Sequence, residues 1–175
     1  MNKFIRIALI VVAVLAVAFF VLRTYTKSKS PEAVAVFKQD GLEVQVNYCQ
    51  PAKKGRAIFG SLIPYGQVWR TGANEATLIS FNKDVLLAGK PLKAGKYTLW
   101  TIPGANEWTV IINSQTGQWG TSYDESKDVL RVNVASAMKP EAVESFTIAF
   151  MPQADGADMR LRWDMTEVAV PIRVR

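Results

Sequence analysis

The sequence predicts an all-β protein, an antiparallel β-sandwich of about 8–10 short strands preceded by one N-terminal transmembrane helix. Short runs in which apolar and polar residues alternate recur along most of the chain, and residues typical of turns separate them. No helical periodicity longer than about two turns follows Pro31, whereas one apolar run before it is long enough to cross a bilayer.

The first element is the apolar segment from Phe4 to Leu22, which only Arg6 interrupts. At about 1.5 Å per helical residue, this segment spans roughly 28 Å, close to the thickness of a hydrocarbon core. Ala16-Val17-Ala18 has the small-x-small form of a signal-peptidase site, but the hydrophobic run continues beyond it to Leu22. We therefore expect an uncleaved signal anchor that binds the membrane through Phe4 to Leu22, with cleavage after Ala18 as the alternative.

Three parts follow from this pattern: a signal anchor at 1–22, a polar tether at 23–33 and a β-sandwich domain at 34–175. Basic residues flank both ends of the anchor, so the distribution of positive charge does not decide its orientation. A short basic amino terminus before an apolar stretch is typical of exported proteins. We therefore expect the domain on the extracytoplasmic side, in the cell envelope or periplasm. The sequence does not predict an oligomeric state.

The formal net charge of +6 at pH 7 is concentrated near the anchor. Five of the 21 Lys and Arg residues precede Pro31, and all 15 Asp and Glu residues follow it. The chain from Pro31 onward therefore has 16 basic and 15 acidic residues, a net charge of +1. A nearly neutral domain lacks a broad surface for neutralising phosphates, so we expect no nucleic-acid partner.

The chain contains no histidine and one cysteine, which excludes several kinds of site. Ser-His-Asp and Cys-His catalysis, His-ligated metals and an intramolecular disulfide all require residues that are missing. We expect Cys49 to be a small buried hydrophobic residue. Asp124, Glu125 and Asp128 could offer oxygen ligands, but their spacing does not match a helix-loop-helix calcium site. We expect no cofactor and no metal.

The alternating runs are predicted strands, and they occupy 42–48, 77–81, 96–102, 108–113, 129–134, 145–150, 159–163 and 167–174. One short segment, Lys139 to Glu144, is a candidate helix, because Pro140 suits a first helical turn. In the run 96–102 both faces carry apolar residues. This strand is therefore either central in the sheet or has an outer face that lines a groove.

The segment 55–77 has little periodicity and is rich in glycine and aromatic residues, so we expect a long structured connection between two strands. Its motifs and those that follow are GRxIFG, PYGxxWRTGANEAT, KPLxAGxYTLWTIPG, EWTVIxN, QWG and YDESKDVLRV. Together they resemble the bacterial domain-of-unknown-function family 2911, over roughly Val36 to Ile172. The resemblance implies an exported bacterial domain and supplies no activity or catalytic residue.

Seven residues are candidates for ligand binding. They comprise four aromatic residues and three polar residues of the long connection, namely Trp69, Trp100, Trp119 and Tyr123, with Arg70, Asn74 and Glu75. In one interpretation the aromatic faces form a wall and the polar groups supply hydrogen bonds, an arrangement that suits sugar rings or a peptide. In the other, Arg70 and Glu75 form an internal ion pair that fixes the loop to the sheet.

We therefore predict a membrane-anchored, extracytoplasmic binding or interaction module for an envelope glycan or protein. One alternative is a carbohydrate-active hydrolase that uses Glu75 with a second carboxylate, such as Asp124 or Glu107. The other is a purely structural envelope protein. No residue is assigned a catalytic role. These hypotheses are distinguished by whether four side chains point into an open concavity or into the core, namely Trp69, Arg70, Asn74 and Glu75.

Overall fold

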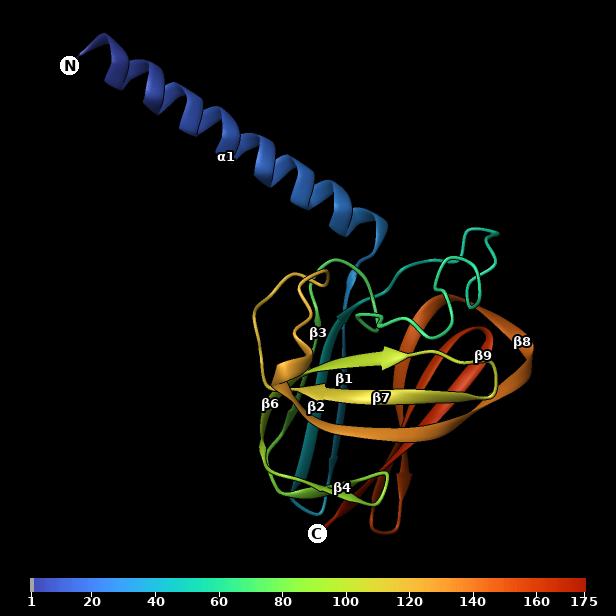
Figure 1. The fold of residues 1–175 in the computed structure, drawn as a ribbon. Helices are drawn as coiled ribbons and strands as arrows, with labels where there is room; N and C mark the ends of the chain where they lie inside the picture. The colour runs from blue at the N-terminus through green and yellow to red at the C-terminus, as the bar shows by residue number, and fades with distance from the viewer. Residues whose placement is uncertain (1) are drawn as a thin grey trace.

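The computed structural model describes residues 2–175 and consists of one long helix followed by an antiparallel β-domain (Figure 1). Strands account for 53% of the chain. The elements are α1 (Lys3–Lys29), β1 (Glu32–Gln39), β2 (Leu42–Cys49), β3 (Thr77–Phe81), β4 (Val85–Leu87), β5 (Lys90–Leu92), β6 (Gly95–Ile102), β7 (Glu107–Asn113), the 3-10 turn η1 (Glu125–Lys127), β8 (Asp128–Gln153) and β9 (Gly156–Val174). The predicted fold class is confirmed.

The nine strands form one antiparallel sheet in the order β1-β2-β3-β6-β7-β8-β9-β4-β5. Strand β8 belongs to both halves of this sheet. Its first part, through Ala135, pairs with β7, and its remainder pairs with β9. Figure 1 shows β8 curving around the domain, which brings the two halves face to face as the layers of a sandwich.

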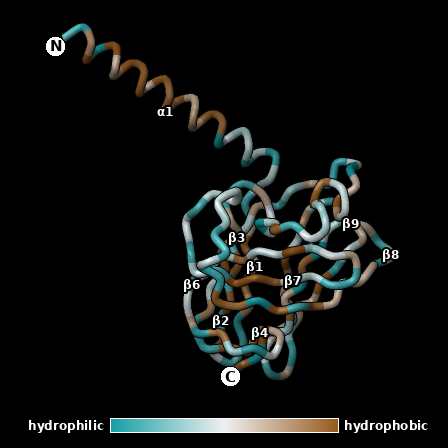
Figure 2. Tube along the Cα trace, viewed as in Figure 1, coloured by the Kyte–Doolittle hydropathy of each residue, from teal (hydrophilic) through white to brown (hydrophobic). Residues whose placement is uncertain are grey.

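The core lies between these layers, because alternate residues of each strand point inward. Val44, Val46 and Ile79 from one half are fully buried in the same cluster as Leu161 and Ile172 from the other. Figure 2 shows apolar segments along the strands inside the domain, and a continuous apolar stretch along α1. The core needs no disulfide, since Cys49 is a free buried thiol, as expected.

The candidate helix at Lys139–Glu144 is wrong, because these residues lie inside β8. Between the pairs Met138↔Thr166 and Val143↔Asp164, the register of β8 against β9 shifts. The extra residues of β8 form an irregularity that contains Pro140, which cannot donate to a strand ladder. Pairing of the flanking residues with β9 keeps this segment extended, a constraint that local sequence does not contain.

Helix α1 is long and apolar enough to cross a membrane, and a signal sequence would have the same properties. It continues seven residues past Leu22 and ends at Lys29, so much of the segment predicted as a polar tether is helical. Only Ser30 and Pro31 separate α1 from β1. The end of the domain at which β1 begins is therefore the end next to the helix (Figure 1).

Candidate functional site

The connection between β2 and β3 crosses the end of the sandwich that faces α1 (Figure 1). Trp69 holds this connection against the sheet. The backbone of Trp69 pairs with Thr101, with N–O distances of 2.7 and 2.9 Å. Its indole is buried among four aromatic side chains, Phe59, Trp108, Phe146 and Trp163. Trp69 is therefore a core residue that closes the end of the sandwich.

Two left-handed residues shape the segment that follows Trp69. Thr71 has φ 54° and Asn74 has φ 60°, and this conformation is unfavourable for a β-branched residue such as Thr71. Thr71 is fully buried, and its carbonyl oxygen accepts a 2.7 Å hydrogen bond from Thr77 Oγ1. The packed surroundings hold this strained turn, which reverses the chain between Arg70 and Glu75.

Arg70 lies on one side of the turn and has no carboxylate partner among the described residues. Its guanidinium donates a 3.2 Å hydrogen bond to the carbonyl oxygen of Asn74. Burial lowers the pKa of Arg70. A Cβ at Gly120 would lie 2.3 Å from Cδ of Arg70, so only glycine at this position leaves room for the arginine stem. Arg70 is thus positioned by packing and by one neutral acceptor.

The Arg70 side chain lines a pocket of about 450 Å³ at the end of the domain next to α1. Four of its lining residues are cationic and none is acidic. The cations are Lys29, Lys54, Arg56 and Arg70. Asn74 also lines this pocket, but its Nδ2 is buried beside the thiol of Cys49 and does not face the cavity. We call this cavity the Arg70 pocket; its lining carries positive charge that no acidic lining residue compensates.

Apolar side chains complete the Arg70 pocket. Leu62 and Ile63 from the loop line it, together with edges of the mostly buried Trp69 and Trp163. The sequence interpretation named Arg70, Asn74 and Trp69 but missed Lys29, Lys54 and Arg56. A signal existed for two of these, because Lys53-Lys54-Gly55-Arg56 is a short basic run without an acidic neighbour.

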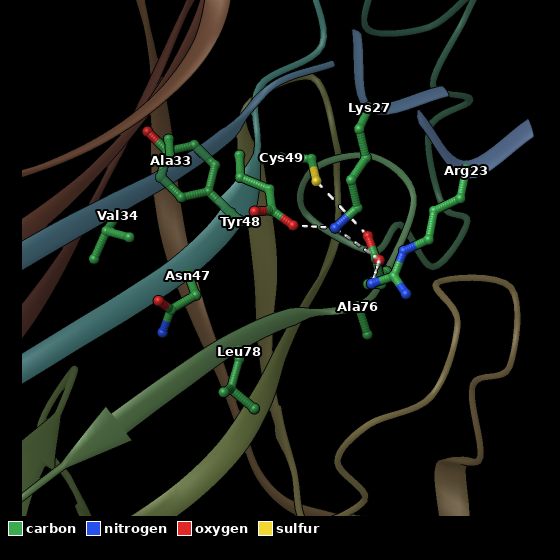
Figure 3. Close-up of a pocket in the computed structure, with 11 residues that line it drawn as sticks. Arg23, Lys27, Ala33, Val34, Asn47, Tyr48, Cys49, Ala76 and Leu78 are labelled. Carbon is green, nitrogen blue, oxygen red and sulfur yellow. Dashed lines mark hydrogen bonds and ion pairs between the residues drawn. The ribbon is translucent and has the colours of Figure 1, made fainter. Parts of the chain in front are cut away.

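Glu75 points to the other side of the turn, so the hypothesis of an Arg70–Glu75 ion pair is wrong. Its carboxylate lies 3.4 Å from the Arg23 guanidinium and 3.2 Å from Nζ of Lys27, both on α1 (Figure 3). The thiol of Cys49 approaches it at 3.8 Å. Burial acts to raise the pKa of Glu75, but a backbone hydrogen bond and the cations of α1 outweigh burial, and the pKa is lowered.

These contacts line a second pocket of about 330 Å³ between the last turns of α1 and strands β1 to β3. Figure 3 shows the Lys27 and Arg23 side chains reaching from α1 towards the centre of this pocket, with Cys49 beside them. Lys27 also pairs with Glu32. The positive and negative charges of this pocket therefore neutralise one another. These ion pairs hold α1 against the β-domain.

Among the remaining candidates, Trp119 lies beside Glu75, because the backbones of these two residues form an isolated β-bridge. Trp100 and Tyr123 line neither pocket. Trp119 is 43% exposed and lines an apolar groove with Phe19 and Leu22 of α1. Trp100 is 1% exposed, on the outer face of β6, and packs on Tyr123 with a ring separation of 5.0 Å. The structure therefore does not gather the four aromatic residues into one wall.

Tyr123 belongs to a network that fixes the segment between β7 and β8 over Trp100. Its hydroxyl donates to Asp128 at 2.7 Å and accepts from Arg131 at 2.9 Å. Burial and the bond to Asp128 raise the pKa of Tyr123 to about 12. Glu125 pairs with Arg131 at 2.8 Å, so two of the acidic groups considered for calcium bind arginine instead. Within residues 2–175 no group of three His, Cys, Asp or Glu could hold a metal ion.

Comparison with known families places this geometry in context. The model of the family described as "Protein of unknown function (DUF2911)" matches residues 30–172, which is most of the chain. The chain belongs to the DUF2911 family. The resemblance inferred from the motifs is thereby confirmed, and the DUF2911 domain coincides with the β-domain that follows α1. No curated protein and no solved structure matches the chain.

Proposed function

We propose that this DUF2911 protein is a membrane-anchored, extracytoplasmic binding module whose Arg70 pocket takes an anionic ligand. One observation carries the proposal: the half-buried Arg70 and three further cations line a pocket that has no acidic lining residue. A desolvated charge without a counter-charge lowers stability, so a ligand carboxylate or phosphate is the natural partner for it. The guanidinium suits this role because it binds both kinds of group bidentately.

The positions of the aromatic residues favour recognition of an anionic group by the Arg70 pocket over stacking of a sugar ring. Trp69 and Trp163, the aromatic residues that line the Arg70 pocket, are almost fully buried and offer no open ring face to a ligand, and the exposed Trp119 lines a separate groove. An envelope glycan or protein is a suitable ligand where it presents acidic groups. The apolar α1 supports anchoring, and the short basic amino terminus before it supports an extracytoplasmic domain.

Nothing among the described residues favours a hydrolase. A general acid needs a raised pKa, whereas the pKa of Glu75 is lowered and two cations occupy its carboxylate. We therefore assign Glu75 to the contact between α1 and the domain. No catalytic residue is proposed.

The proposal is tested by calorimetric titration of the full-length protein in a neutral detergent with sodium phosphate, galacturonate and neutral galactose. We expect the two anions to bind and galactose not to bind. Arg70→Gln should weaken anion binding roughly tenfold, the usual range for a lost charge-assisted hydrogen bond. Lys96→Gln removes one exposed charge from β6 and should leave binding unchanged. Equal binding of galactose, or an unchanged affinity in Arg70→Gln, would refute the proposal.

A further inference from the structure

The Arg70 pocket shares residues with the end of the membrane helix. Lys29, the last residue of α1, and Ser30 both line it. The apolar part of α1 ends at Leu22, and the seven residues from Arg23 to Lys29 extend the helix by about 10 Å. The headgroup layer on each side of a bilayer is roughly 5–8 Å thick. With α1 as the anchor, the pocket therefore opens at the level of the lipid headgroups or just beyond it.

Exposed apolar side chains surround this end of the domain. Leu62, Tyr65 and Val68, in the connection between β2 and β3, are 40%, 48% and 38% exposed. Trp119, in the connection between β7 and β8, borders the groove that Leu22 of α1 also lines. Figure 1 shows both connections at the end of the sandwich from which α1 leaves. Tyrosine and tryptophan at such positions are typical of side chains that lie in the membrane interface.

The charges of the Arg70 pocket are complementary to an anionic lipid. The chain from Pro31 onward has a net charge of +1, yet the Arg70 pocket gathers Lys54, Arg56 and Arg70 beside Lys29 without an acidic lining residue. Leu62 and Ile63 on the same pocket wall provide contact for the glycerol and upper acyl part of a lipid. A soluble anion would use the cations but not these apolar residues.

We infer that the ligand of the Arg70 pocket is the phosphate headgroup of an acidic phospholipid in the membrane that holds α1. This inference rests on the proposed anion-binding function and names the source of the anion. Arg70 binds the phosphate oxygens, and Lys29, Lys54 and Arg56 surround the charge. The headgroup then fixes the domain against the bilayer, so that anchor and pocket together define its orientation.

The test uses full-length protein in nanodiscs of phosphatidylcholine, with and without phosphatidylglycerol, and follows amide hydrogen exchange across residues 50–76. If lipid occupies about 80% of the pockets, only about one fifth of the molecules are free to open and exchange. Amide exchange is then about fivefold slower. We expect this protection only with phosphatidylglycerol, and we expect 0.5 M salt to reduce it. Arg70→Gln, with roughly tenfold weaker binding, should reduce this protection from about fivefold to about 1.4-fold. Lys54→Gln/Arg56→Gln should weaken it without affecting folding, because both side chains are exposed.

A matched double control, Lys83→Gln/Lys96→Gln, removes two charges at the far end of the domain, near the β1–β2 hairpin. If the control variant loses as much protection as Lys54→Gln/Arg56→Gln, the protection reflects net charge alone. That result would refute a specific headgroup site. If sodium phosphate binds in calorimetry but phosphatidylglycerol gives no protection, the lipid inference fails and the proposed function remains. If no anion binds at all, both fail.

Discussion

Arg70 and Glu75 are five residues apart and have opposite charges, yet the structure assigns them to different pockets. The left-handed Thr71 and Asn74 turn the chain between them, and Gly120 packs against the arginine stem. Glu75 instead pairs with Arg23 and Lys27 of α1, about 50 residues earlier in the sequence. Each residue therefore acts through its own neighbours, and Arg70 keeps an unneutralised charge.

This separation predicts additive mutational effects. Glu75→Ala should cost up to about 1 kcal/mol, because its ion pairs are partly exposed. Arg70→Ala loses packing but also removes a desolvated charge, so its effect should be small. The double variant should equal the sum of the singles within about 0.5 kcal/mol, measured as the free energy of unfolding of the full-length protein in urea. A coupling above about 1 kcal/mol would contradict the geometry and restore a direct pair.

At the scale of elements, two irregular segments complete the sandwich. The bend in β8 passes the chain from one layer to the other, and the segment between β7 and β8 covers the outer face of β6. The second segment depends on the Tyr123–Asp128–Arg131 network rather than on regular pairing. Polar side chains at its centre replace the backbone ladder, so we expect the stability of this element to depend on pH.

Tyr123→Phe should remove the phenolic ionisation near pH 12 from the tyrosinate absorbance titration. Because the folded pKa of about 12 exceeds the unfolded value of about 10, the folded state holds this proton more tightly. The stabilisation is fully present below pH 10 and is lost as pH rises towards 12. The free energy of unfolding, measured from pH 9 to 12, should therefore fall more steeply for the wild type than for Tyr123→Phe. Tyr65→Phe, at an exposed loop position, is the control, and a loss of the late ionisation there would contradict the assignment.

At the scale of the whole molecule, α1 and the candidate pockets lie at the same end of the β-domain. Glu75 and Trp119 contact α1, the Arg70 pocket includes the last helical residue, and the exposed loop residues lie beside them. The opposite end holds the β1–β2 hairpin and the short β4–β5 hairpin. The Arg70 pocket therefore lies at the end of the domain that is next to α1.

An uncleaved anchor predicts that full-length protein stays in the membrane fraction after a carbonate wash, and that its amino terminus precedes Phe4. When Val11 and Leu15 are both replaced by Arg, the protein should disappear from the membrane fraction. Charges at the centre of a helix oppose its insertion into the bilayer. Exposed Lys96→Gln should not change the distribution. An amino terminus at Phe19 would establish cleavage after Ala18 and overturn the anchor.

The sequence alone determined the class of the fold, the apolar helix and most strand positions, because these depend on local periodicity. The strand at 77–81 matches its prediction residue for residue. Local patterns also predicted a long structured connection around Trp69. They could not determine that Trp69 closes the core, that Lys139–Glu144 stays extended, or that Glu75 binds α1 rather than Arg70. Those outcomes depend on which distant segments pack together, and only the tertiary structure brings Lys29 and Arg56 to the same pocket as Arg70.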